Sequence, residues 1–131
     1  MQTSTDKTIA ILGFSDKPTR YSYKAHQMLL EYGFTHQIGI TAKKLTEKET
    51  IFNHIELVST IADIQQPIDT LTLYIGIERL TPLIHQILAL SPRRIITNPG
   101  TENRALINQA REQGIEVVEG CTLVMLRTGG F

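Results

Sequence analysis

The sequence has little cysteine, no net charge and no long hydrophobic run. Its single cysteine, Cys121, excludes an internal disulfide and a zinc site built from cysteines, and it suits a reducing compartment. Because 13 lysines and arginines balance 13 aspartates and glutamates, overall charge gives no reason to expect nucleic-acid binding, and any anion site must be local. No apolar segment approaches the length of a membrane span or a signal region. We therefore expect a cytoplasmic protein that binds neither nucleic acid nor a membrane.

Catalytic and metal-binding patterns are also missing from the sequence. It holds no Ser-His-Asp set, no paired carboxylates at a useful spacing and no P-loop. The histidines share no spacing typical of a metal site, and we expect His26 and His85 at the surface or rim of helices. Cys121 has no catalytic partner nearby in the sequence, which favours a packed thiol over a nucleophile. We expect neither catalytic residues nor a metal.

The 131 residues are enough for one domain with a substantial core. We expect a flexible start at residues 1–7 and a single domain over residues 8–131. Its opening unit is an apolar run at 9–12, which predicts a strand buried on both faces, followed by a turn at Gly13. A helix then has one apolar stripe and a glycine typical of a left-handed helix end: Ala25, Met28, Leu29, Tyr32 and Gly33.

Strands and helices alternate along the rest of the chain. The pattern predicts further strands at 36–40, 55–58, 70–75, 93–97 and 115–118. It predicts a short helix within 59–64, a helix that starts at Thr81-Pro82 and ends before Ser91-Pro92, and another over 102–113. We interpret residues 41–50 as a loop. This alternation predicts a three-layer α/β domain that is Rossmann-like, with a mostly parallel sheet of five to six strands in the order 3-2-1-4-5.

In such a sheet, a ligand lies beyond the carboxyl ends of the strands, where the strand order reverses. The loops at 13–22 and 76–81 are expected to meet there, with Lys43 and Lys44 on the same rim. The dinucleotide fingerprint Gly-x-Gly-x-x-Gly is absent from the first loop. The second strand is followed by Thr41 and Lys43, where an acidic residue would bind a ribose. These features weigh against NAD and suit a ligand with an extra ribose phosphate.

Short segments between residues 9 and 126 resemble those of a known family. They are Gly13-Phe14-Ser15, Ser15-Asp16-Lys17-Pro18, Gly39-Ile40-Thr41-Ala42-Lys43-Lys44, Tyr74-Ile75-Gly76, 98–103 and 119–126. The first and third resemble the Gly-Phe-Thr and Gly-Val-Thr-Pro-Gly-Lys segments of the N-terminal domain of succinyl-CoA synthetase α subunits. The second resembles the Ser-x-x-Pro of small single-domain coenzyme A-binding proteins, and the chain is similar to that family over nearly its whole length.

The resemblance implies a coenzyme A cofactor, with Lys44 near it. It also implies binding without catalysis, because the histidine that the synthetase phosphorylates lies in a second domain, outside the part that this chain resembles. Ala42 and Gly76 stand where the family has prolines that shape the coenzyme site.

Each candidate ligand contact also has a purely structural explanation. Ser15 and Ser22 would bond phosphate oxygens, or else serve as turn or cap residues. The loop cations would neutralise phosphates, or else be solvated. Tyr74 would border the ligand, or else belong to the core. The candidate contacts are Gly13, Phe14, Ser15, Lys17, Pro18, Arg20, Ser22, Thr41, Lys43, Lys44, Tyr74, Ile75 and Gly76.

Two hypotheses of different classes follow. The preferred one is a coenzyme A or acyl-CoA binding protein that holds the ligand's phosphates at the N-terminus of the first helix. The other is an enzyme component, either an NAD(P)-binding dehydrogenase-like domain or a non-catalytic subunit of an acyl-CoA ligase. In both, the partner is a small nucleotide ligand. The apolar segment 123–126 either packs on the sheet edge or forms a homodimer contact, and the sequence leaves both open.

Overall fold

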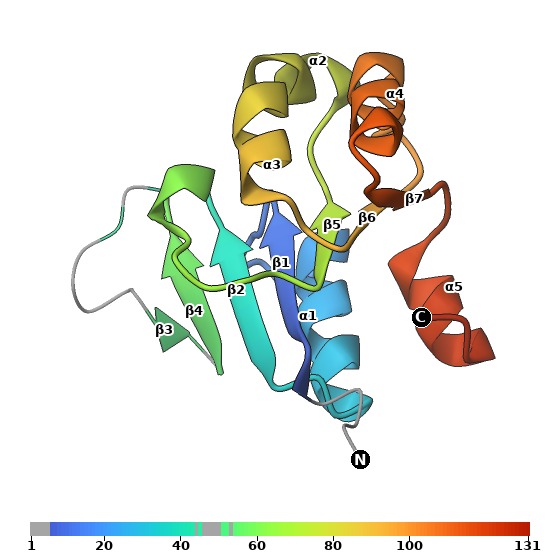
Figure 1. The fold of residues 1–131 in the computed structure, drawn as a ribbon. Coiled ribbons are helices and arrows are strands. Elements are labelled where there is room, and N and C mark those ends of the chain that lie inside the picture. Colours follow the sequence, from blue (N-terminus) through green and yellow to red (C-terminus); the bar gives the residue numbers. More distant parts are fainter. Residues whose placement is uncertain (1–5, 44, 46–50, 53) are drawn as a thin grey trace.

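A single sheet runs through the middle of the molecule (Figure 1). The computed structural model describes residues 6–43, 45, 51–52 and 54–131, so most of the expected flexible start lies outside the described residues. Within them, seven strands lie in the order β3-β4-β2-β1-β5-β6-β7. The strands are β1 Thr8–Leu12, β2 His36–Ile40, β3 Ile51–Phe52, β4 Ile55–Val58, β5 Thr70–Leu73, β6 Arg94–Thr97 and β7 Glu116–Val118.

The strand pairing confirms the predicted α/β fold and strand order. All described pairs are parallel except β3 with β4, which is antiparallel. Without the unpredicted two-residue strand β3, the parallel strands follow the order 3-2-1-4-5-6. After β1 the chain builds outward through β2 and β4, and it then returns to pair β5 with the other side of β1. The strand order therefore reverses at β1, which opens a crevice at the carboxyl ends of β1, β2 and β5.

Helices cover both faces of the sheet (Figure 1). Leu29 and Leu126, from α1 and α5, belong to the core cluster on one face, whereas residues of η3, α2, α3 and α4 belong to the cluster on the other. The helices are α1 Tyr21–Glu31, α2 Ile77–Leu80, α3 Ile84–Leu90, α4 Arg104–Glu112 and α5 Thr122–Thr128, with 3-10 turns η3 Ile61–Asp63 and η4 Thr81–Leu83.

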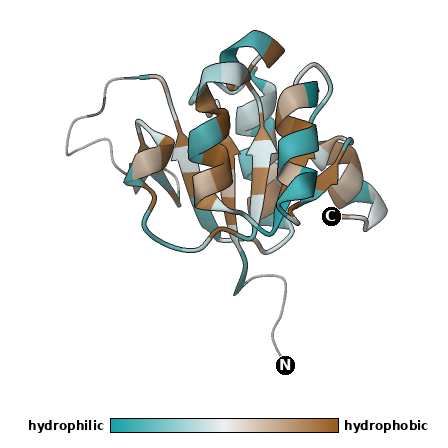
Figure 2. Cartoon of the chain, turned by 45° about the horizontal axis from the view of Figure 1, so that its top comes forward, coloured by the Kyte–Doolittle hydropathy of each residue, from teal (hydrophilic) through white to brown (hydrophobic). Residues whose placement is uncertain are grey.

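The central strand is apolar because both of its faces are covered. In β1, Ile9 and Ile11 belong to the cluster under α1, and Ala10 and Leu12 belong to the cluster under α3 and α4. All four side chains are at most 4% exposed. Figure 2 shows the same division, with hydrophobic residues along the strands and hydrophilic ones on the outward sides of the helices. The continuous apolar run therefore marks the strand correctly.

His26 is buried, which corrects the expectation of a surface or rim position. Its side chain is 0% exposed, and its Nδ1 donates to Oε1 of Gln37 at 2.9 Å. Gln37 in turn donates through Nε2 to the backbone oxygen of Phe34 at 2.8 Å. The histidine ring also meets the ring of Phe14 edge-on, with centroids 5.6 Å apart. A buried glutamine on β2 thus allows a polar residue on the inner face of α1.

The helix after β5 starts earlier than predicted. Gly76 is the N-cap of α2, and Thr81 and Pro82 lie in the 3-10 turn η4 that joins α2 to α3. The hydroxyl of Thr81 accepts a hydrogen bond from Nδ2 of Asn103 at 3.0 Å, so it supports α4 and caps no helix. The predicted end is confirmed, because Ser91 takes a left-handed conformation with φ of 50°.

Several other elements are shorter than predicted. The strand expected at 70–75 ends at Leu73, so that Tyr74 and Ile75 belong to the loop that follows it. The helix expected from residue 102 begins at Arg104, because the side chain of Asn103 caps it by accepting from the backbone N–H of Leu106 at 3.0 Å.

The apolar segment 123–126 lies in a helix. Neither of its two expected roles, packing on the sheet edge or a homodimer contact, included a helix. The helix is α5, and Leu126 on its inner side is 2% exposed within the core cluster under α1. Figure 1 shows α5 beside α1 on the same face of the sheet. The segment thus completes the covering of that face.

Candidate functional site

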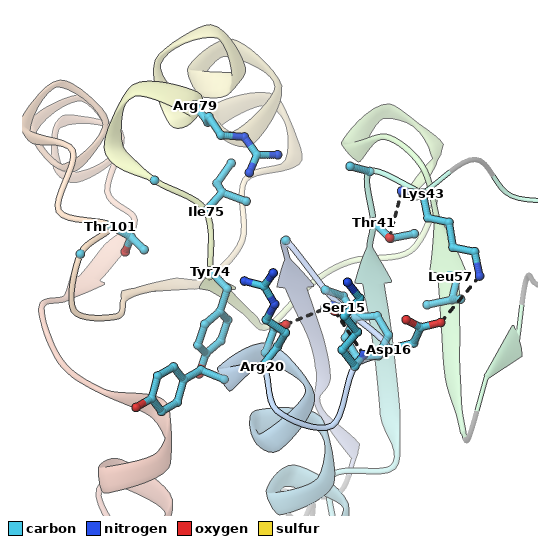
Figure 3. A pocket seen from close by; sticks show the side chains of 18 of the residues that line it. Ser15, Asp16, Arg20, Thr41, Lys43, Leu57, Tyr74, Ile75, Arg79 and Thr101 are labelled. Carbon is cyan, nitrogen blue, oxygen red and sulfur yellow. Dashed lines mark hydrogen bonds and ion pairs between the residues drawn. The ribbon is translucent and has the colours of Figure 1, made fainter.

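A cleft lies at the carboxyl ends of the central strands, where the strand order reverses (Figure 3). Its volume is about 680 Å³. Three loops supply most of its walls, those that follow β1, β2 and β5, and the turn after β6 closes one side. The lining residues are Gly13, Phe14, Ser15, Asp16, Lys17, Arg20, Tyr21, Ser22, Thr41, Ala42, Lys43, Leu57, Tyr74, Ile75, Gly76, Arg79, Pro99, Gly100 and Thr101.

The cleft brings together most of the candidate contacts that the sequence predicts. Pro18 is not among the lining residues, and Lys44 lies outside the described residues. Sequence reasoning did not select Asp16, Tyr21, Leu57, Arg79 or the turn at 99–101 as ligand contacts. Arg79 lies within residues 76–81, which the sequence predicted to face the site. Its positive charge in that segment could have identified it as a ligand contact. Leu57 had no such signal, because only the pairing of β4 with β2 places it there.

The floor of the cleft depends on Gly13, which has φ of +89°. Its backbone N–H donates to the carbonyl of Ile40 at 3.0 Å, at the end of β2. On its other side, a Cβ atom would lie 2.5 Å from Cγ2 of Ile75 and 2.8 Å from the carbonyl oxygen of Tyr74. The loop after β1 therefore passes close to both neighbouring strand ends. Gly13 and Tyr74 share one rim, as the sequence predicted.

Two serine hydroxyls shape the loop between β1 and α1. The backbone N–H of Ser15 donates to Oγ of the buried Ser22 at 3.1 Å, which ties the loop to the first turn of α1. Oγ of Ser15 accepts from the backbone N–H of Lys17 at 3.2 Å. Each hydroxyl therefore has a structural role in positioning the loop, and contact of either serine with a ligand stays a prediction.

The N-terminus of α1 opens into this cleft. Its N-cap is Arg20, whose side chain makes no capping hydrogen bond, and the first helical residues Tyr21 and Ser22 also line the cleft. Unpaired N–H groups and the partial positive charge at a helix start favour an anion. With 11 residues, α1 is long enough for this effect. The cleft can thus accept a phosphate at this point.

Four basic side chains line the same cleft as the start of α1, although the whole chain is neutral. Lys17 and Arg20 come from the loop after β1, Lys43 from the loop after β2 and Arg79 from α2. Asp16 is the only acidic residue among the described lining residues, and its Oδ2 lies 3.6 Å from Nζ of Lys43. Figure 3 shows Arg20 and Arg79 reaching toward the same space from opposite walls. The cleft therefore has an excess of positive charge.

Asn98 holds the wall made by the turn after β6. The side chain is 3% exposed, and its Nδ2 donates to Oγ1 of Thr72 at 2.7 Å and to the carbonyl of Leu73 at 2.8 Å. Its Oδ1 accepts from the backbone N–H of Thr122 at 2.9 Å. The hydroxyl of Thr101 closes the turn by donating to the carbonyl of Asn98 at 2.8 Å. One amide thus links β5, α5 and the cleft wall.

Tyr74 lines the cleft and also packs against the core cluster under α1. Burial raises the pKa of its hydroxyl to about 12 from the ordinary value of 10.0, although the nearby hydroxyls of Thr122 and Thr72 favour the anion. The tyrosine is therefore neutral at physiological pH. Its ring contributes to the core and to the cleft wall together.

The raised pKa of Tyr74 predicts a loss of stability at high pH. A group whose folded-state pKa exceeds its unfolded value stabilises the fold fully below the unfolded pKa of 10.0, and this contribution falls as pH approaches about 12. We expect Tyr74 to account for roughly 2 kcal/mol of the stability lost over this range. In Tyr74→Phe, urea unfolding measured at increasing pH should lack this loss.

The matched control is Tyr32→Phe, since Tyr32 is 46% exposed and outside the cleft. It should follow the wild-type pH profile. If Tyr74→Phe and the wild type lose stability in parallel between these pH values, the hydroxyl of Tyr74 ionises without cost and our assignment is wrong.

Two further features of the structure concern metal binding and membranes. Among the described residues, no group of three or more histidine, cysteine, aspartate or glutamate side chains is arranged to hold a metal ion. In the same part of the chain, none of the helices combines the length and the apolar character that crossing a membrane requires.

Solved structures share this fold over most of its length. An uncharacterized protein is 37% identical, with a TM-score of 0.83, and the match covers 95% of this chain and 98% of that one. A protein from Thermus thermophilus is 24% identical, with a TM-score of 0.80 and coverage of 95% and 90%. A dinucleotide-forming acetyl-coenzyme A synthetase from Ca. Korarchaeum cryptofilum, in complex with phosphate and ADP, is 15% identical, with a TM-score of 0.70, covering 87% of this chain and 25% of its own.

Sequence comparison gives the family. Residues 7–127, which include all of the described cleft loops, match the family described as CoA binding domain. This match spans the sheet from β1 to β7 and most of α5. The fold predicted from the strand pattern and the family resemblance predicted from the loop segments thus lead to the same conclusion, that this chain belongs to the CoA-binding domain family.

Proposed function

We propose that this protein binds coenzyme A or an acyl-CoA and has no catalytic machinery of its own. The observation that carries the proposal is that Lys17, Arg20 and Arg79 line the same cleft as the N-terminus of α1, in a chain with no net charge. Such a site suits a pyrophosphate, because helix N–H groups and basic side chains act on the same anion.

The size of the cleft and the family support the same ligand. About 680 Å³ is in the range of clefts that hold a nucleotide-sized molecule. In the proposed arrangement the pyrophosphate lies at the start of α1, and the adenosine lies across the strand ends toward β2 and β4. Lys43 and Thr41 would then face the ribose, which in coenzyme A carries a phosphate.

A non-catalytic subunit of an acyl-CoA ligase is a second candidate. The fold match with the acetyl-coenzyme A synthetase supports it, because this chain corresponds to only a quarter of that enzyme. The rest of such a reaction would require a partner chain. An NAD(P)-binding domain is the other alternative, and the missing glycine fingerprint weighs against it.

Calorimetry and thermal unfolding with coenzyme A, acetyl-CoA, NAD and NADP test the proposal. A ligand at 100 times its Kd should stabilise the protein by about 2.7 kcal/mol. We expect coenzyme A or acetyl-CoA to do so, and we expect Lys17→Ala and Arg20→Ala each to weaken binding by roughly tenfold, since each removes a charged contact to phosphate.

The matched control is Arg127→Ala, which removes an exposed arginine from α5, outside the cleft. It should leave the Kd unchanged. Stabilisation by NADP without stabilisation by coenzyme A would contradict the proposed function and favour the NAD(P) alternative.

The cytoplasmic location and the homodimer remain predictions.

A further inference from the structure

Asp16 places a carboxylate at the end of β2 that the sequence order does not reveal. No acidic residue follows β2 directly, since Thr41, Ala42 and Lys43 stand there. In the fold, Asp16 reaches this point from the loop after β1, and Figure 3 shows its side chain directed at Lys43. In Rossmann-like folds, a carboxylate at the end of the second strand meets the ribose, and it disfavours a phosphate there.

The pair of Asp16 and Lys43 is held loosely. The two charged atoms are 3.6 Å apart, and the side chains are 47% and 54% exposed. An ion pair of this kind contributes little to stability because water and salt screen it. An incoming anion can therefore replace Asp16 beside Lys43 at little cost in free energy.

We propose that Asp16 is a specificity-determining residue, which competes with the ribose phosphate of the ligand for Lys43. This inference rests on the proposed function, and it concerns one part of the ligand. In a coenzyme A complex, the phosphate on the ribose takes the place of Asp16 beside Lys43, and the carboxylate opposes it. In a dephospho-coenzyme A complex, Asp16 and Lys43 stay paired. Asp16 thus reduces the preference for the phosphorylated ribose.

The test compares the Kd of coenzyme A with that of dephospho-coenzyme A at one ionic strength. In Asp16→Asn, we expect coenzyme A to bind about two- to fivefold more tightly, which is the size of effect that an exposed ion pair produces. The Kd of dephospho-coenzyme A should change by less than about twofold. In a protein that already carries Lys43→Gln, Asp16→Asn should change the Kd of coenzyme A much less. The lysine for which the carboxylate and the phosphate compete is then absent.

The matched control is Glu112→Gln, which makes the same change of net charge on the exposed end of α4, outside the cleft. It should leave both affinities unchanged. The inference is overturned if Asp16→Asn changes the two affinities equally or leaves both as they were, or if its effect persists in Lys43→Gln. Failure of the wild-type protein to bind either ligand would instead overturn the proposed function.

Discussion

Replacing Gly13 by alanine should destabilise the protein by about 3 kcal/mol or more and abolish ligand binding. Two independent causes add up in this variant. The backbone at Gly13 has φ of +89°, which an L side chain rarely adopts, and the new Cβ would lie 2.5 Å from Cγ2 of Ile75 and 2.8 Å from the carbonyl oxygen of Tyr74. Because one neighbour is backbone, the rim of the cleft itself must move. Urea unfolding and calorimetry with coenzyme A measure the two effects.

Gly114→Ala is the control that separates these causes. Gly114 has φ of +87°, nearly the same as Gly13, but a Cβ there would meet nothing within 4 Å. It should lose only about 1 kcal/mol, the cost of the left-handed conformation, and it should bind ligand normally. If the two variants lose the same unfolding free energy, the close approach of Gly13 to Tyr74 and Ile75 does not contribute to the destabilisation.

Asn98→Ala should lose about 3 to 5 kcal/mol of stability and weaken ligand binding. The substitution leaves the backbone N–H of Thr122, the carbonyl of Leu73 and the hydroxyl of Thr72 without the hydrogen bonds that the amide makes at 2.7 to 2.9 Å. When a buried polar group loses its hydrogen-bond partner, the free-energy cost of its desolvation is no longer offset. The turn that carries Thr101 then also loses its anchor, so we expect binding to fall together with stability.

Asn108→Ala is the matched control for this prediction. Asn108 lies on the exposed side of α4, so the same atoms are removed into water. Its stability should change by no more than about 0.5 kcal/mol. If Asn98→Ala is equally mild in denaturant titrations, then water replaces the amide and the link between β5, α5 and the cleft wall is not a stabilising one.

The sequence allows the fold and the position of the cleft to be predicted because both follow from local patterns. An apolar run at 9–12 has to be covered on both faces, and alternation of strands with helices favours parallel pairing with right-handed crossovers. These two rules predict a parallel sheet, and its parallel strands follow the predicted order 3-2-1-4-5 with β7 added at the edge. Ligand loops collect at the carboxyl ends of the strands in any such sheet, so most of the predicted contacts line one cleft.

Local patterns were less reliable wherever a polar residue is buried. The predicted stripe of α1 included Tyr32, which is 46% exposed, whereas the buried face includes Ser22 and His26. Both polar residues are satisfied by partners distant in sequence, Ser22 by the backbone of Ser15 and His26 by Gln37. A prediction from hydrophobic periodicity places such residues at the surface, because the pattern carries no information on their hydrogen-bond partners.

Patterns along the chain therefore predict the parallel sheet, the cleft at β1 and the family resemblance. Which charged side chains meet in the cleft depends on the folded chain. It brought Asp16 to Lys43 across two loops and Arg79 to the wall opposite Arg20, and it joined Asn98 to Thr122. Such pairs depend on the path of the chain through space, and no spacing along the chain encodes them. Strand and helix patterns are local, whereas the charge and hydrogen bonding of a site are not.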